Sequence, residues 1–207
     1  MANILHIDSS PRGDRSQSRT LTKEFITAWK ASHPQDTVTY RDVGRHPVPH
    51  VDEAWIAAAF TPPENYTPEL QAAIKVSNDL VDEFLTADYY VFGIPMYNFG
   101  VPSTFKAYID QIVRVGRTFT MTSDGAFEGL VNNKKMLIIT ARGGSFPPGT
   151  PMAEFDFQEP YLRTVFGFLG ITDIRFIHAE NLNGGGDVRE QSLTAARSGI
   201  DTAVANW

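Results

Sequence analysis

A hydroxyl-rich segment at residues 9–18 carries the first residues that could do chemistry. It reads Ser-Ser-Pro-Arg-Gly-Asp-Arg-Ser-Gln-Ser, follows the apolar run 3–8 and leads into a segment with helical spacing. Hydroxyl donors, free backbone N–H groups and the positive end of a helix dipole together bind a phosphate. One serine alone is explained well enough as a helix cap, but several donors together favour a ligand. We therefore expect a phosphate site made by Ser10, Ser16, Gln17 and Ser18.

The kind of phosphate compound is limited by motifs that this segment lacks. Neither the triphosphate-binding G-x-x-x-x-G-K-[ST] nor the dinucleotide-binding G-x-G-x-x-G occurs in residues 9–18. Hydroxyl and amide groups can hold a phosphate dianion without a lysine or a metal ion. The segment therefore predicts a monophosphate.

A second group of candidate residues follows the apolar run 89–94. Residues 95–102 read Pro-Met-Tyr-Asn-Phe-Gly-Val-Pro, which places a thioether, two aromatic rings and an amide together. The apolar side chains suit a flat ring system such as isoalloxazine, while the amide and peptide groups suit its polar edge. A packed surface loop is the weaker interpretation, because exposed apolar residues at such a position usually contact a ligand. The candidate ring-binding residues are Pro95, Met96, Tyr97, Asn98 and Phe99.

A third candidate segment, Thr-Ala-Arg-Gly-Gly, occupies residues 140–144. Adjacent glycines let the backbone approach a ligand closely, and peptide N–H groups or a cation would stabilise negative charge at the N1–O2 edge of a reduced flavin. The candidates are Ala141, Arg142, Gly143 and Gly144, which carry weight only beside the other two segments. By contrast, we interpret the glycine-rich residues 183–187 as a flexible connector.

The elements that must position these segments alternate along the chain. Buried strands are predicted at residues 3–8, 37–42, 89–94, 135–140 and 173–178, and helices at about 18–32, 67–87, from 102 onward and 187–205. This alternation predicts right-handed βαβ units in an open, doubly wound parallel sheet with helices on both faces. Ligands bind at the carboxyl ends of strands in such a sheet, which is where the three segments lie.

Composition narrows the function further. The formal net charge of −6 excludes the broad basic surface that nucleic acids or anionic membranes require. With no cysteine, the chain has no disulfide, thiolate metal site or cysteine nucleophile, so redox chemistry needs a bound cofactor. We expect no metal site either, because His46 and His50 lack a third ligand. The lack of a signal segment and of a long apolar run predicts a single cytoplasmic domain over residues 1–207.

Taken together, these segments resemble the FMN-dependent NADH-azoreductases, relatives of the NAD(P)H:quinone reductases in the flavodoxin-like group. The resemblance extends over essentially the whole chain, and its most specific part is P-M-Y-N-F-x-V-P-S-x-F-K at residues 95–106. The other shared motifs are S-x-x-x-x-x-S-Q-S at 10–18, F-x-G-L at 127–130, R-G-G at 142–144 and G-F-L-G-I-T-D at 167–173.

The resemblance implies a flavodoxin-like, five-stranded parallel sheet in the order 2-1-3-4-5. It implies that Ser10 and residues 16–18 hold the FMN phosphate, that 96–99 border the ring and that 141–144 meet its pyrimidine edge. It also implies a homodimer with interfacial sites and a ping-pong cycle. In that cycle NADH or NADPH gives a hydride to flavin N5, and a quinone or azo compound collects it without a protein nucleophile.

Two departures from the family pattern concern the substrate entrance. R-G-G is followed by Ser145-Phe146 and a proline-rich stretch to Pro151, where the family has an aliphatic residue and a histidine. Met121 stands where an aromatic residue is common. Acceptor preference and the choice between NADH and NADPH depend on such positions. The candidates for the acceptor pocket, some of them contributed by a partner subunit, are Phe119, Met121, Phe146 and Phe168, although an aromatic residue is more often core.

Two other function classes remain open. A flavodoxin-type electron carrier has the same fold and cofactor, but such carriers have a T-x-[ST]-x-x-T phosphate loop and strongly acidic surfaces, which favours the enzyme here. A flavin-binding sensor is distinguished from an enzyme by NADH consumption. Hydrolases fit less well, because the chain has neither a cysteine nucleophile nor a G-x-S-x-G motif.

Overall fold

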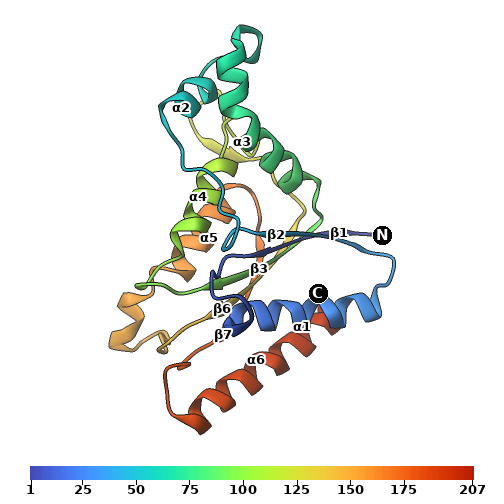
Figure 1. The fold of residues 1–207 in the computed structure, drawn as a ribbon, viewed down its shortest axis with the longest axis vertical. Coiled ribbons are helices and arrows are strands. Elements are labelled where there is room, and N and C mark those ends of the chain that lie inside the picture. The colour runs from blue at the N-terminus through green and yellow to red at the C-terminus, as the bar shows by residue number, and fades with distance from the viewer.

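The central element of the computed structural model, which describes residues 1–207, is a five-stranded parallel sheet (Figure 1). Its strands lie in the order β2-β1-β3-β6-β7, and a separate two-stranded hairpin is formed by β4 and β5. When only the five parallel strands are numbered along the chain, their order across the sheet is 2-1-3-4-5, as predicted. The strands of the sheet are β1 (Asn3–Asp8), β2 (Thr37–Asp42), β3 (Tyr89–Pro95), β6 (Lys135–Ala141) and β7 (Asp173–Ala179).

The register of the central strands brings the candidate segments together. β3 lies between β1 and β6, with Asp8 opposite Gly93 and Pro95 opposite Ala141. Strands covered on both faces are mostly apolar, which explains the predominantly aliphatic and aromatic residues of β1, β3 and β6. The carboxyl ends of these strands therefore meet at one edge of the sheet.

Helices cover both faces of the sheet, as expected (Figure 1). On one face α1 and α6 contact each other, and their apolar residues join a cluster of 12 buried residues with β1, β3 and β6. On the other face α3, α4 and α5 contribute to a cluster of 23. The helices are α1 (Gln17–Ser32), α2 (Glu53–Ala59), α3 (Pro68–Thr86), α4 (Ser103–Ile112), α5 (Glu159–Phe168) and α6 (Gly186–Asn206).

The helix starts follow from local sequence. Ser16 caps α1 by accepting a hydrogen bond from the Arg19 N–H, and Thr67 caps α3 by accepting one from the Leu70 N–H. Proline at Pro68 and an acid at Glu69 then occupy the first turn of α3, where both are favoured. These two starts were visible in the sequence because capping depends on neighbouring residues.

The remaining segments are short. Hairpin strands β4 (Phe119–Met121) and β5 (Phe127–Gly129) pack beside α5, and the Val131 N–H donates to the Leu169 carbonyl at 2.8 Å. Three 3-10 helices occur at Gly13–Arg15, Pro63–Asn65 and Pro151–Phe155, the last after the proline-rich stretch. None of the helices combines the length and the apolar character needed to cross a membrane.

Candidate functional site

Residues from all three candidate segments surround one cavity of about 320 Å³ at the carboxyl ends of β1, β3 and β6. The convergence follows from the strand order, because β1, β3 and β6 are neighbours in the sheet. The sequence-predicted residues that line the cavity are Ser10, Ser16, Gln17, Pro95, Met96, Tyr97, Ala141, Arg142 and Gly143.

The first segment forms the hydroxyl-rich corner of the cavity. Ser16 and Ser18 lie with their Oγ atoms 3.1 Å apart, and both residues are buried. The N–H groups of the first turn of α1 have no carbonyl partner within the helix. One of them, the Arg19 N–H, donates to the Ser16 hydroxyl instead. Ser18 is not part of the cavity wall and reaches the ligand side only through Ser16. This corner presents hydroxyls and a helix N-terminus to a ligand.

Two arginines add positive charge to the same corner. Arg12 and Arg15 line the cavity but were not among the predicted site residues. Both lie within residues 9–18, so two cations beside the hydroxyl cluster were a signal that sequence reasoning left unused. A dianionic ligand is stabilised by such cations.

The loop after β7 forms another wall that sequence reasoning missed. Leu182 and Asn183 of this loop line the cavity together with Arg189 of α6, although the sequence predicts a flexible connector from Asn183 onward. The N–H groups of Leu182 and Asn183 donate to the carbonyls of Arg142 and Gly143 at 3.0 and 3.2 Å. A Cβ on Gly143 would lie 2.5 Å from Asn183 Nδ2, so the glycine allows this close packing. Asn183 is therefore part of the site wall, held against the segment after β6.

The second segment makes a tight turn beside the cavity. Tyr97 and Gly100 exchange two backbone hydrogen bonds of 3.0 Å, with Asn98 at φ 47° and Phe99 at φ 70° between them. Asn98 and Phe99 do not line the 320 Å³ cavity. Asn98 faces a neighbouring cavity of about 550 Å³ together with Tyr97, and Phe99 is exposed.

The third segment offers peptide groups to the cavity, because the Arg142 guanidinium is bound elsewhere. Arg142 Nη1 lies 2.9 Å from Asp156 Oδ2 and 3.4 Å from Glu180 Oε1, and its Nε donates to Gln158 Oε1 at 3.1 Å. Gln158 in turn donates to the Ile94 carbonyl at 3.1 Å. The buried Arg142 side chain thus connects loops through its hydrogen bonds and ion pairs, and two carboxylates balance its charge. Gly144 does not line the cavity and lies near the ring of Phe146.

The four residues predicted for the acceptor pocket separate into two places. Phe146 is buried beside Arg142 and lines an adjoining cavity of about 560 Å³. Phe119 and Phe168 contact each other with ring centroids 4.7 Å apart, in a cluster with Phe127 of the hairpin. Met121 lies on the same hairpin and is exposed. Within one chain, Phe119, Met121 and Phe168 do not line the 320 Å³ cavity.

Known proteins have a similar architecture and related sequences. Residues 2–204 match the family described as having a flavodoxin-like fold. The chain is 67% identical over 208 residues to the FMN-dependent NADH:quinone oxidoreductase 2 of Trichormus variabilis, with 100% of both chains covered. An azoreductase of Bacillus anthracis is 30% identical with a TM-score of 0.92 over 100% of both chains. An FMN-dependent NADH-azoreductase of the same species, solved in complex with FMN, is 26% identical with a TM-score of 0.89 over 99% of this chain and 98% of that one. The chain therefore belongs to the family of FMN-dependent NADH:quinone oxidoreductases and azoreductases with a flavodoxin-like fold.

Proposed function

We propose that this protein is a cytoplasmic, homodimeric FMN-dependent oxidoreductase that carries two electrons from NADH or NADPH to a quinone or an azo compound. The observation that carries the proposal is the convergence of a hydroxyl-rich helix start, an apolar loop and a glycine-rich loop on one cavity. FMN held in this cavity would supply the redox chemistry, two-electron transfer from the nicotinamide to the acceptor in a ping-pong cycle.

The phosphate corner fits a flavin monophosphate. Ser10, Ser16 and Gln17 line it, Ser18 supports Ser16, and the helix N-terminus faces the same space. The side chains of Arg12 and Arg15 balance the charge of a dianion there. This part of the site binds and orients the cofactor by its phosphate group.

The remaining walls fit a flat ring with one polar edge. Pro95, Met96 and Tyr97 give apolar surface, and the peptide groups of residues 141–143 give hydrogen-bonding groups. The absence of a side chain at Gly143 lets Asn183 approach this wall. These residues orient the ring and exclude water from one side of it, which is what a protein contributes to chemistry carried by a cofactor.

Several exposed apolar side chains lie on or near the turn at residues 97–100, whose Tyr97 lines this cavity. Phe99 contacts Phe155 with ring centroids 5.4 Å apart, and Met152 and Phe157 are also exposed. The Phe157 N–H donates to the Phe99 carbonyl at 3.1 Å, so these residues belong to one local surface. Contiguous exposed apolar surface marks an interaction site. It supports a second copy of the chain that covers the cavity and completes an acceptor pocket.

The whole chain is proposed to act as one domain. Both buried clusters pack on the same sheet, one on each face, so neither forms a core without the other's strands. Residues 1–207 would then fold together.

An anaerobic titration tests the redox proposal. FMN-reconstituted protein receives NADH first and a quinone second while the flavin absorption band is recorded. We expect NADH to bleach the band and the quinone to restore it. Failure to take up FMN would contradict the proposal, whereas FMN uptake without bleaching by NADH or NADPH would favour a one-electron carrier.

A further inference from the structure

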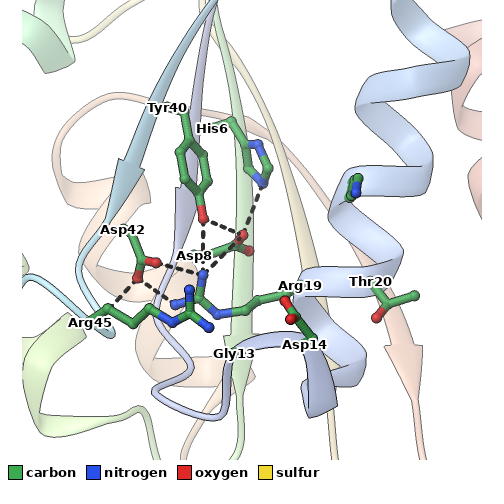
Figure 2. Close-up of a pocket in the computed structure, with 10 residues that line it drawn as sticks. His6, Asp8, Gly13, Asp14, Arg19, Thr20, Tyr40, Asp42 and Arg45 are labelled. Carbon is green, nitrogen blue, oxygen red and sulfur yellow. Dashed lines mark hydrogen bonds and ion pairs between the residues drawn. The ribbon is translucent and has the colours of Figure 1, made fainter.

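A second polar cavity, of about 570 Å³, lies behind the phosphate segment (Figure 2). It is bordered by the ends of β1 and β2 and by the first turns of α1, and nearly all of its side chains are polar. Figure 2 shows that the Arg19 side chain extends from α1 toward Asp42, Tyr40 and Asp8. Arg19 is thus the centre of a polar network that the proposed chemistry does not use.

Arg19 is held on one side by the end of β2. Its Nη1 donates to Asp42 Oδ2 at 2.7 Å and to the Tyr40 hydroxyl at 2.9 Å, while its Nη2 donates to Asp42 Oδ1. The side chains of Arg19 and Asp42 are each only 11% exposed. Burial is the largest single influence and raises the pKa of Asp42. The hydrogen bonds from Arg19 and the Arg45 N–H, together with the charges of both arginines, outweigh burial and hold this pKa below its ordinary value. The pair is therefore a bidentate, charge-assisted contact in a largely dry environment.

On the other side, the same guanidinium contacts the phosphate segment. Arg19 Nε and Nη2 donate to the carbonyl oxygen of Ser10 at 2.7 and 2.5 Å. Ser10 lines the 320 Å³ cavity, and its hydroxyl accepts a hydrogen bond from the Arg12 N–H at 3.3 Å. Arg19 does not line that cavity itself. Its side chain thus connects the end of β2 to the backbone of a predicted phosphate-binding residue.

The turn after β2 is packed closely against the phosphate segment. The N–H groups of Val43 and Gly44 donate to the Asp8 carbonyl at 3.0 and 3.2 Å. A Cβ on Gly44 would lie 2.5 Å from the carbonyl carbon and oxygen of Ser10. The turn after β2 therefore lies directly against the phosphate segment, and the Arg19–Asp42 pair fixes the segment relative to it.

We propose that Arg19, supported by Asp42, is a positioning residue for phosphate binding. By holding the Ser10 carbonyl on the side away from the 320 Å³ cavity, Arg19 preorganises the hydroxyl and peptide groups that would face the phosphate. A loop that is already ordered loses less conformational entropy when the ligand binds. The inference rests on the proposed FMN-dependent function and deepens it, because it concerns the phosphate rather than the ring.

Comparing two flavins tests this role. Riboflavin has the ring but no phosphate, so a defect confined to phosphate positioning weakens FMN binding alone. For Arg19→Met we expect FMN affinity to fall by about ten- to a hundredfold and riboflavin affinity to change by less than about twofold. Both dissociation constants are measured by flavin fluorescence titration. Arg19→Lys keeps the charge but cannot bond Asp42 and Ser10 together, so an intermediate loss of FMN affinity is expected.

A second variant removes the risk that an unpaired Asp42 unfolds the protein. Arg19→Met combined with Asp42→Asn eliminates both charges, and far-UV circular dichroism and Tm report folding. The same selective loss of FMN affinity is expected. Arg41→Met is the matched control, because Arg41 on β2 makes a bidentate pair with Glu83 at 2.6 and 2.9 Å, directed toward α3 rather than the phosphate segment. Its FMN and riboflavin affinities should equal those of the parent even if Tm falls.

Two outcomes would overturn the inference while leaving the proposed function intact. Unchanged FMN affinity in the Arg19 variants is one. The other is an equal loss of FMN and riboflavin affinity that follows Tm and also occurs in Arg41→Met, which would indicate a purely structural role. If the parent protein bound no FMN at all, the proposed function and this inference would both be wrong.

Discussion

At the scale of single residues, Ser16 combines two tasks at the start of α1. Its hydroxyl accepts a hydrogen bond from the Arg19 N–H, which caps the helix, and Ser16 also lines the proposed FMN cavity. The Ser18 hydroxyl is hydrogen-bonded to the Ser16 hydroxyl. If FMN binds as proposed, helix stability and ligand binding depend on the same side chain.

Replacing both serines by alanine therefore has two expected effects. Ser16→Ala/Ser18→Ala should weaken FMN binding, because hydroxyl donors to the phosphate are lost. It should also lower the free energy of unfolding by about 1 kcal/mol through the lost cap. Calorimetric titration with FMN and urea unfolding measure the two effects. Thr27→Ala is the control, since the exposed Thr27 hydroxyl donates to the Lys23 carbonyl on the same helix and neither residue lines the 320 Å³ cavity. FMN binding as tight as in the parent would contradict the phosphate role.

Glu159 gives the stability of the protein a specific dependence on pH. The hydrogen bond with His178, at 2.8 Å, is the largest cause that lowers the pKa of Glu159 from 4.5 to about 2, and Arg163 adds to it. A carboxyl group with a lowered pKa stabilises the fold fully above its unfolded pKa. This contribution is lost as the pH falls from about 4.5 toward 2.

Glu159→Gln should remove that contribution. We expect the variant to be less stable than the parent by about 2 kcal/mol near pH 5, and the difference to disappear toward pH 2. Urea unfolding at a series of pH values provides the comparison. Glu154→Gln, at an exposed residue of a 3-10 helix, should reproduce the parent profile. A constant difference between parent and Glu159→Gln across this range would show that the ion pair is not responsible.

At the scale of elements, β3 passes α1 closely because of one glycine. A Cβ on Gly93 would lie 2.4 Å from Asp8 Oδ1 and 3.0 Å from Thr22 Cγ2. The Thr22 hydroxyl donates to the same carboxylate oxygen at 2.9 Å, so Asp8 cannot move away freely. The strand, the helix and the end of β1 thus share one tightly packed point next to the phosphate segment.

Gly93→Ala should consequently destabilise the protein by about 2 kcal/mol, because the added methyl group displaces packed atoms. Gly167→Ala provides a contrasting control. Gly167 is exposed in α5 with no atom within 4 Å of an added Cβ, so alanine there should stabilise the helix by up to about 1 kcal/mol. Thermal and urea unfolding of both variants measure the effects. A neutral Gly93→Ala would mean that Asp8 relaxes at little cost.

Much of the element structure was predictable because its causes are local. Short, mostly apolar runs indicated the central strands, and capping residues such as Thr67 indicated helix starts. The wall formed by Asn183 was not predictable, because its hydrogen bonds join loops that are 40 residues apart in sequence. The Arg19 network was missed for the same reason: a lone arginine in a helix gives no sign of the carboxylate on a different strand that pairs with it.

The predicted site residues show the same division. Those at the carboxyl end of a central strand, such as Pro95 and Ala141, line the cavity, since strand order determines where they lie. The places of Phe119, Met121 and Phe168 depend on how the hairpin packs. Within one chain Phe119 packs on Phe168 of α5, and Met121 is exposed on the hairpin. Their place in an acceptor pocket would require a second chain.

At the scale of the whole molecule, one sheet separates two buried clusters, and the cofactor cavity opens at its edge beside exposed aromatic side chains. α1 and α6 cover one face, and the other helices lie across the sheet from them (Figure 1). The cavity is therefore not enclosed by the chain's own core. Any further covering must come from a substrate or from another molecule.

Charge on this apolar surface should disrupt the proposed dimer. Phe155→Asp/Phe157→Asp places two carboxylates on exposed residues, so folding should be retained while self-association weakens by at least about tenfold. Sedimentation equilibrium of parent and variant measures the change. Phe60→Asp is the control, because Phe60 is exposed at the end of α2. A monomeric parent, or a variant that associates as strongly as the parent, would argue against this surface as the interface.

At residues 98–99, thermal stability and an exposed aromatic side chain favour different residues. Asn98 and Phe99 both have positive φ. Asparagine tolerates this region, so the cost of about 1 kcal/mol falls on Phe99, and an Asn-Gly pair would adopt this turn more readily. Phe99→Gly should thus raise Tm even though its contact with Phe155 is lost. A sequence selected only for thermal stability would carry glycine here, so the phenylalanine marks a position where stability is lower in return for an exposed aromatic surface shared with Phe155.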